Sequence, residues 1–400
     1  MPSGASTGTH EALELRDGGA RYGGRGVGDA VDNVNGWLAE AVAGLDVADT
    51  EAVDNALREA DPSPGYAKAG ANGVMAVSIA AARASAVAHG MSLARLLTGE
   101  GPLLLPMPMV NVISGGAHAG GLIDIQDVLV IPTAASSFAE AIEWCAAVRE
   151  ATGELALRRH HREAVLVADE GGLGLGLTTN REALELLVAG IEHAGLTPGT
   201  DAHVALDIAA SELYRDDVYT LTTEQRQLSS AELVGEVAGW CDDFPIVSIE
   251  DLLSEDDWDG WVQATTTLGD DIELVGDDLF VTDPARLQRG ISTGAANSVL
   301  VKVNQNGTLA GARDVLDLAH RHDYHTVVSA RSGETEDSWL ADVAVGWRAG
   351  QIKVGSTHRS ERTAKWNRLL ELEATEQTTF AGPWIEGRPT QTSASKKDSP

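Results

Sequence analysis

Five apolar runs of this chain each lead into a charged side chain: VALDIAAS (204–211), IVSIEDL (246–252), ELVGDDLF (273–280), VLVKVNQ (299–305) and GQIKVG (350–355). The charged residues are, in order, Asp207, Glu250, Asp277, Lys302 and Lys353. Such runs are typical of a parallel barrel, in which the strand ends open onto one face while the rest of each strand is packed. The pattern therefore predicts three carboxylates and two lysines gathered at one end of a barrel.

The three carboxylates predict a metal site. Hard oxygen ligands suit Mg²⁺, and a bound Mg²⁺ draws electron density from a substrate carboxylate, which favours removal of the adjacent α-proton. A lysine held near a divalent cation binds its proton less tightly, so Lys302 is the expected base, and Lys353 is expected to neutralise the substrate carboxylate. Two other interpretations stay open. An acidic residue at a strand end is often a helix cap, and Lys302 taken alone fits a surface lysine, although its apolar flanks oppose that.

Strand-like and helical segments alternate from Ala164 onward, and AVLVADE (164–170) is expected to be one of the strands. Alternation of this kind predicts an α/β fold with crossover helices, and the number of units favours a closed barrel over an open sheet. The predicted division of the chain is a smaller, mostly helical domain over 1–105 with a glycine-rich loop at 2–8, a barrel domain over 106–374, and a polar, disordered tail over 375–400.

The charge of the chain limits its partners. Among 400 residues, 60 acidic and 29 basic side chains give a formal charge of −31, which argues against nucleic acid or an anionic membrane surface as a partner. An anionic substrate therefore needs local cations, which the lysines, Arg331 and metal ions would supply.

Cys145 and Cys241 lie far apart, so no disulfide framework is expected. No signal peptide or membrane-length apolar stretch is recognisable, which predicts a soluble, cytoplasmic protein.

Two further loops carry candidate acid–base residues. Asp169 and Glu170 follow the expected strand VLVADE, and Glu170 is the expected acid that helps a hydroxyl group leave, with its neighbour as a cap. His118 lies in the glycine-rich segment GGAHAGG, which carries little weight alone because such loops are common.

Two other loops suit a phosphate group. The opening PSGASTG offers backbone N–H groups for a phosphate and Ser6 for a second metal ion, although the same letters describe any mobile loop. Arg331 in RSGETED suits bidentate phosphate binding, with ion pairing on a helix surface as the alternative.

Together these motifs resemble the enolase family, the Mg²⁺-dependent dehydratases of 2-phosphoglycerate. The resemblance runs in order from Pro2 to about Leu372. It rests on PSGASTG (2–8), EALELRDGG (11–19), GGAHAGG (115–121), DIQ (124–126), DEGG (169–172), LDIAASELY (206–214), SIED (248–251), EDDWDGW (255–261), GDDLFVT (276–282), KVNQNGTL (302–309), RSGETED (331–337), GQIKVGS (350–356) and RSER (359–362).

The resemblance implies an α+β N-terminal domain and an enolase-type (β/α)8 barrel whose first units are irregular, with some antiparallel pairing. It also implies two Mg²⁺ ions, a small anionic phosphorus-containing acid as substrate, and a homodimer that pairs through the small domain. The implied roles are Asp207, Glu250 and Asp277 as ligands of the first Mg²⁺, Ser6 as ligand of the second, Lys302 as base, Glu170 as acid paired with Asp127, and His118, Gln126, Arg331, Ser332 and Lys353 as substrate-binding residues.

The chain departs from the family pattern at four places. Asp127 stands where the family has a glutamate, which loosens its pairing with Glu170. Ala330, in SARSGE, stands where the family has a histidine beside the substrate phosphate. At about 3.3 Å per strand residue, His325 lies roughly 16 Å back along the strand and cannot easily replace it. Leu252 stands where the family has proline. Family members also carry a strand hairpin ahead of the glycine-rich loop, whereas this sequence starts at the loop, so either the gene start is assigned too late or the sheet of the small domain is incomplete.

Ala330 favours a substrate that is larger than 2-phosphoglycerate at its phosphorus end. Exchanging an imidazole for a methyl group opens volume and removes a cationic partner, which suits a phosphorus atom bearing an extra carboxyl group. In this respect the chain resembles carboxyphosphonoenolpyruvate synthases, enolase-like enzymes of phosphonate antibiotic pathways. A glycolytic enolase with tolerated substitutions is the second hypothesis, and a non-catalytic binding protein of enolase descent is the third.

Overall fold

The barrel strands form from the short apolar runs that the sequence pattern predicts. The structure is a computed structural model that describes residues 3–382. Within that range eight strands close into a barrel in the order β13-β12-β11-β10-β9-β5-β3-β2, with β2 pairing back to β13. They are β2 Met107–Ser114, β3 Asp127–Ile131, β5 His203–Asp207, β9 Ile246–Glu250, β10 Glu273–Gly276, β11 Ser298–Val301, β12 His325–Ser329 and β13 Gly350–Gly355. The predicted α/β barrel is confirmed.

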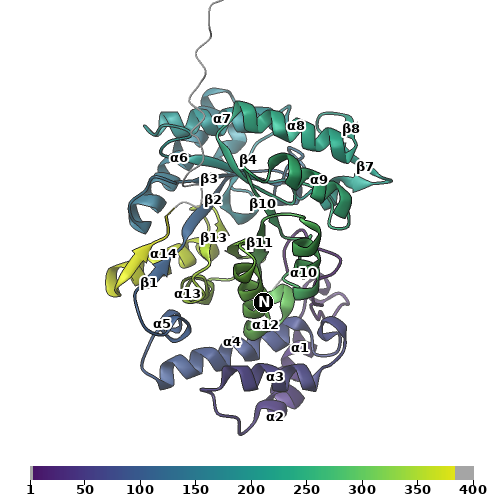
Figure 1. The fold of residues 1–400 in the computed structure, drawn as a ribbon, viewed down its shortest axis with the longest axis vertical. Coiled ribbons are helices and arrows are strands. Elements are labelled where there is room, and N and C mark those ends of the chain that lie inside the picture. The colour runs from purple at the N-terminus through teal and green to yellow at the C-terminus, as the bar shows by residue number, and fades with distance from the viewer. Residues whose placement is uncertain (1–2, 383–400) are drawn as a thin grey trace, which may run out of the picture.

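The strands are buried on both faces, which explains their nearly continuous apolar sequences. Met109, Ala205 and Val275 belong to a cluster contributed by successive barrel strands, whereas the alternate residues Val110 and Leu206 belong to a larger cluster shared with the helices. The helices around the barrel (Figure 1) are α6 Phe138–Arg158, α7 Asn180–His193, α8 Ser230–Asp243, α9 Trp258–Leu268, α10 Pro284–Thr293, α11 Val303–Asn306, α12 Leu309–Arg321, α13 Trp339–Gly346 and α14 Ser360–Thr375.

The first units of the barrel are irregular. β3 runs antiparallel to both of its neighbours, β2 and β5, whereas the other barrel pairs are parallel. No α-helix forms between Ser114 and Asp127, and a connection without a crossover helix returns the chain antiparallel. The antiparallel pairing that the family resemblance implies is therefore confirmed, whereas strand–helix alternation alone predicts a uniformly parallel barrel. The remaining short strands here are β4 Leu173–Gly174, β6 Tyr214–Arg215, β7 Val218–Leu221 and β8 Arg226–Leu228.

The N-terminal domain packs on one side of the barrel as a small helical layer, drawn in purple and blue in Figure 1. Its helices are α1 Gly28–Asn33, α2 Ala39–Val42, α3 Thr50–Ala60, α4 Ala71–Ala88 and α5 Leu93–Thr98, with a π-helical turn over Val34–Leu38. Leu38, Val53, Leu57 and Val74 form its core.

The implied α+β character of this domain is not found in residues 3–102, which contain no strand. The backbone groups of the extended segment after the glycine-rich loop form hydrogen bonds with partners other than a strand. Ala12 N donates to Gln305 O, and Leu13 N donates to Gly65 O. The backbone of Leu15 exchanges hydrogen bonds with the side chain of Asn72. These groups are therefore satisfied without a neighbouring strand.

The helix α4 corrects the expectation that no apolar stretch reaches membrane-spanning length. By length and composition Ala71–Ala88 is long and apolar enough to cross a membrane, but 56% of it is buried inside the protein. It packs against α3, α5 and α11, as a core helix does.

Residues 164–170, expected to be a strand, are not one. They contribute to 3₁₀ turns at Arg162–Val165 and Asp169–Gly171. The apolar side chains of Val165 and Leu166 are 72% and 66% exposed, and Glu170 has a positive φ of 64°, which a strand does not accommodate.

The prediction of a disordered tail over 375–400 is wrong for its first part. Strand β14, Thr378–Phe380, pairs in parallel with β1, Leu103–Leu105, and the ring of Phe380 packs edge-on against Phe138. Aromatic packing and backbone pairing hold this polar segment in place. Residues 383–400 lie outside the described residues.

Candidate active site

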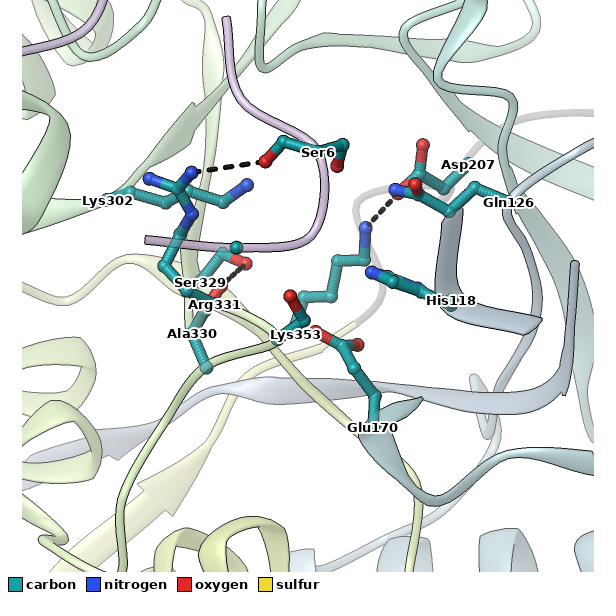
Figure 2. Close-up of a pocket in the computed structure, with 12 residues that line it drawn as sticks. Ser6, His118, Gln126, Glu170, Asp207, Lys302, Ser329, Ala330, Arg331 and Lys353 are labelled. Carbon is teal, nitrogen blue, oxygen red and sulfur yellow. Dashed lines mark hydrogen bonds and ion pairs between the residues drawn. The ribbon is translucent and has the colours of Figure 1, made fainter. Parts of the chain in front are cut away.

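A small pocket lies at the carboxyl ends of the barrel strands and collects most of the predicted site residues (Figure 2). Its cavity is small, ≈ 20 Å³, so we expect the surrounding groups to move when a substrate enters. The predicted residues that line it are Ser6, His118, Gln126, Glu170, Asp207, Lys302, Arg331, Ser332 and Lys353. Gly4, Ser329 and Ala330 also line it. Asp127, Glu250 and Asp277 lie just behind this lining, in contact with its members.

Lys353 joins two of the three predicted metal ligands. Its Nζ donates to Asp207 Oδ2 at 2.6 Å and to Glu250 Oε2 at 2.7 Å, and Figure 2 shows it reaching toward Asp207. The two carboxylates end β5 and β9 and are register partners. Burial disfavours the charge on Lys353, but Asp207 and Glu250 together raise its pKa well above the ordinary value. Lys353 is therefore a fixed positive charge in the pocket.

Lys302 follows β11 and contacts the third predicted ligand, because its Nζ donates to Asp277 Oδ2. Burial acts to lower the pKa of Lys302, but Asp277 raises it, and the net shift is upward. The lowered pKa that the sequence predicts for a base is therefore not a property of this arrangement, in which the carboxylate holds the ammonium form. A divalent cation on Asp277 would weaken that hold.

Negative charge exceeds positive charge around these strand ends. Burial and the neighbouring Asp207 raise the pKa of Glu250 well above its usual range. Asp251 accepts hydrogen bonds from the backbone N–H groups of Asp277 and Asp278. Burial and Asp277 raise the pKa of Asp278 to about 8. Such crowding of carboxyl groups is relieved by a bound cation.

Several groups of side chains have ligand atoms close enough together to hold a metal ion. In the described residues these groups are Asp251, Asp277 and Asp278; His118, Asp127 and Glu170; and His10, Glu255 and Asp256. Asp277 belongs to the first group, whereas Asp207 and Glu250 are held by Lys353 instead. Buried carboxylate oxygens at three adjacent strand ends nevertheless match the hard donors that Mg²⁺ prefers, so the residues present fit this ion.

Glu170, His118 and Asp127 form a second buried group. His118 Nδ1 lies 3.0 Å from Asp127 Oδ2, and Asp127 Oδ1 also accepts from Asn111 Nδ2 and Ser114 Oγ. Asp127 thus contacts the histidine and two neutral side chains, and no hydrogen bond links it to Glu170 among the described residues. Burial would lower the pKa of His118, but Asp127 and Glu170 raise it to about 9.

Substitution of Asp127 by asparagine should therefore lower the pKa of His118. The substitution keeps the size of the side chain but removes the charge that holds the imidazolium, so the titration midpoint should fall from about 9 by about 1–3 units. Proton NMR of the histidine ring resonances as a function of pH measures it, with the other histidines as internal controls. An unchanged His118 midpoint would show that Asp127 does not set its charge.

The glycine-rich loop folds over the pocket and contacts the predicted phosphate-binding residues. Ala5 N donates to Ser332 Oγ at 2.5 Å, and Arg331 Nη2 donates to the backbone oxygen of Ser6 at 3.3 Å, as Figure 2 shows. Gln126 Nε2 donates to Asp207 Oδ2 at 3.2 Å. The Oε1 atom of Gln126 is buried without a hydrogen-bond partner in the described part of the chain, so it can accept a hydrogen bond from a ligand.

Sequence reasoning missed several residues that support the site. Glu11 pairs with Arg331, and Gln305 Nε2 donates to Asp277 Oδ1 at 2.8 Å. Arg362, fully buried, donates to the backbone oxygens of Arg331, Ser332 and Val354. The sequence signal was their position inside EALELRDGG, KVNQNGTL and RSER, but nothing in those segments shows what each side chain contacts.

A barrel with an additional N-terminal domain and a buried pocket of lysines and carboxylates at the carboxyl ends of its strands is typical of barrel enzymes. Residues 102–386 match the family model described as enolase, C-terminal TIM barrel domain. Residues 1–97 match the model described as enolase, N-terminal domain. Since the two matches cover most of the chain, this protein belongs to the enolase family, and its activity is expected within the lyase class.

Proposed function

We propose that this protein is a Mg²⁺-dependent dehydratase that removes water from a 2-phosphoglycerate-like acid to give a phosphoenolpyruvate-type product. The observation that carries the proposal is the convergence of Lys302 and Lys353 with Asp207, Glu250 and Asp277 in one buried site. The site suits α-proton removal, because the proposed base contacts one proposed cation ligand, Asp277, and the fixed positive charge of Lys353 contacts the other two, Asp207 and Glu250.

The proposed ligands of the first Mg²⁺ are Asp207, Glu250 and Asp277, and Ser6 on the glycine-rich loop is the proposed ligand of the second. When bound, Mg²⁺ would stabilise the negative charge that develops on the substrate carboxylate. Lys353 would add its fixed charge to the same carboxylate, since Asp207 and Glu250 keep it protonated despite its burial.

Two proton transfers complete the proposed reaction. Lys302 Nζ takes the α-proton, so the C–H electron pair forms the new double bond as the bond to the β-hydroxyl group breaks. Burial raises the pKa of Glu170, but His118 and Arg362 lower it on balance, so the acid role requires that Glu170 takes up a proton when substrate binds. The protonated Glu170 then donates this proton to the hydroxyl group, which leaves as water. Among the pocket residues labelled in Figure 2, Lys302 and Glu170 lie on different sides. This arrangement suits a base and an acid that act on two different substrate atoms. We assign Asp127 to fixing the orientation of His118.

Ala330 supports a substrate with a larger phosphorus end, such as the acid that a carboxyphosphonoenolpyruvate synthase dehydrates. Ala330 lines the pocket, and its backbone N donates to Lys353 O at 2.9 Å. Arg331 and Ser332, the proposed phosphate-binding residues, follow Ala330 in the chain and line the same pocket. Glycolytic turnover of 2-phosphoglycerate is the alternative proposal, favoured by the retained lysines and carboxylates.

Substitution of Ala330 by histidine separates the two proposals. An imidazole would supply a charge-assisted hydrogen bond to the phosphate, so kcat/KM for 2-phosphoglycerate should rise roughly 10-fold or more, while kcat/KM for 2-phosphonoformyl-glycerate should fall. Steady-state assays with both acids measure the ratio. Ala330→Leu is the matched control, because it fills volume without adding a donor and should lower the second value without raising the first. If the ratio of kcat/KM for the two acids were the same in the unsubstituted protein and in Ala330→His, the specialised role would be contradicted.

We further propose that the protein acts in the cytoplasm as a homodimer. The acidic surface, with a formal charge of −31, supports partners other than nucleic acid or anionic membranes. A non-catalytic role is a weaker proposal, because the lysines and the acid–base residues of the pocket are all present.

A further inference from the structure

We propose that Glu11 is a positioning residue, which couples closure of the glycine-rich loop to the orientation of Arg331 and of the carboxylate Asp277. This inference rests on the proposed function for its kinetic consequence but not for its structural one. Glu11 does not line the pocket, so it acts through the groups that do.

Its first contact fixes the guanidinium group of Arg331. Arg331 Nη1 donates to Glu11 Oε2 at 2.8 Å, and Arg331 Nη2 donates to Glu11 Oε1 at 3.1 Å. The side chains of Arg331 and Glu11 are 2% and 9% exposed. A bidentate pair sets the plane of the guanidinium as well as its place, and burial prevents water from replacing either bond. Glu11 therefore determines which donors of Arg331 remain free for a phosphate.

Its second contact is to the loop itself. Glu11 Oε1 accepts from Gly8 N at 3.0 Å, and Arg331 Nη2 donates to Ser6 O at 3.3 Å. The carboxylate thus holds the carboxyl end of the loop directly, and it holds the middle of the loop through Arg331. Because the cavity is small, ≈ 20 Å³, we expect this loop or its neighbours to move when substrate enters. Reclosure would restore the loop contacts and the arginine orientation in one step.

Its third contact leads to the metal-ligand side of the pocket. Gln305 Nε2 lies 3.4 Å from Glu11 Oε1 and 2.8 Å from Asp277 Oδ1, and its Oε1 accepts from Thr282 Oγ1 at 2.7 Å. The side-chain amide of Gln305 is held on both sides, so its orientation depends on the positions of both carboxylates, Glu11 and Asp277. Glu11 is the side chain that contacts the loop, the arginine and this amide together.

The test compares Glu11→Gln and Glu11→Ala with the matched control Glu14→Gln. Glu14 lies on the same segment and also reaches the loop, since its Oε2 accepts from Ser3 Oγ at 2.8 Å. Its Oε1 pairs with Arg16 rather than with Arg331. If Glu11 and Glu14 only hold the loop in place, all three variants should loosen it. If Glu11 acts through Arg331, only the two Glu11 variants should do so.

Amide hydrogen exchange of residues 4–9 is measured first, without any substrate. We expect exchange to accelerate roughly 10-fold or more in Glu11→Ala, to accelerate less in Glu11→Gln, and to stay within about twofold in Glu14→Gln. If Glu11→Ala fails to fold in a thermal melt, the nearly isosteric Glu11→Gln decides. Unchanged exchange in the Glu11 variants, or equal acceleration in the control, would overturn the proposal.

Steady-state kinetics with 2-phosphoglycerate and 2-phosphonoformyl-glycerate provide the second readout. Loss of the bidentate contact should raise KM roughly 10-fold in Glu11→Ala with a smaller change in kcat, and the control should match the unsubstituted protein. Loss of kcat alone with unchanged KM would contradict the positioning role. If the unsubstituted protein turns over neither acid, the proposed function fails, and the exchange rates still decide the role of Glu11.

Discussion

Replacing Lys302 with methionine is expected to lower kcat for dehydration by about 10²–10⁴-fold, the contribution of a well-placed general base. Methionine keeps the length and most of the volume of the side chain but cannot accept a proton. Asp277 would lose its ammonium partner but would keep the hydrogen bond from Gln305, so the fold should survive. A steady-state assay of product formation with either candidate acid measures the effect.

The control for this prediction is the binding step. Because Lys353 and its two carboxylate partners are untouched, Lys302→Met should bind substrate and Mg²⁺ within a few fold of the unsubstituted protein by calorimetry. A variant that binds normally and is inactive identifies a role in chemistry. Turnover at an unchanged rate would assign the base elsewhere.

Replacing Glu250 with glutamine is expected to weaken Mg²⁺ binding by at least about 100-fold, because changes to outer-shell partners alone weaken metal sites by roughly 10–100-fold. Glutamine removes one of the negative charges that Mg²⁺ would neutralise. It also relieves, without a metal, the burial of charge and the crowding by Asp207 that together raise the pKa of Glu250. Activity at millimolar Mg²⁺ should fall with the affinity. Isothermal calorimetry with Mg²⁺ alone measures the binding, and a Mg²⁺ titration of the rate measures its consequence.

Glu273→Gln is the matched control for the metal prediction. Glu273 is a fully buried carboxylate at the other end of the barrel strand β10, where it accepts from Ser248 Oγ and Gln351 Nε2. Its substitution changes the buried charge equally but leaves the site intact. Equal loss of Mg²⁺ affinity in both variants would indicate a general electrostatic or stability effect and would argue against Glu250 as a ligand.

The ends of the barrel strands could be predicted because buried strand residues are apolar, whereas the residues proposed to carry the chemistry are charged. Asp207, Glu250 and Lys302 each follow a run that is packed on both sides, and a charged group there is too costly to bury without partners. The same runs do not record strand direction, since an apolar segment such as β3 reads alike in a parallel or an antiparallel pair. Its direction was available only from the family resemblance.

The errors in the secondary-structure predictions have identifiable physical causes. AVLVADE has the composition of a buried strand, but Val165 and Leu166 are exposed. Apolar composition alone does not show whether other parts of the protein cover a segment. The polar neighbours of Thr378–Phe380 predict a disordered tail. Its order comes from pairing with Leu103–Leu105, a contact between residues far apart in the chain.

Supporting residues of the site were harder to predict than the residues that line it. Glu11 and Gln305 stand in helix-like or loop sequences where a polar side chain is ordinary. Their importance arises only when the fold brings Arg331 and Asp277 to them. Charge and spacing along the chain carry no signal for such contacts.

Exchange of the α-proton offers the most direct test of the proposed chemistry. Each candidate acid is incubated in D₂O with Mg²⁺, and loss of the C2 proton signal is followed by proton NMR. With at least one of the two acids, the unsubstituted protein should wash out this proton and Lys302→Met should leave it in place. Washout by Lys302→Met at the rate of the unsubstituted protein would contradict proton abstraction by residue 302.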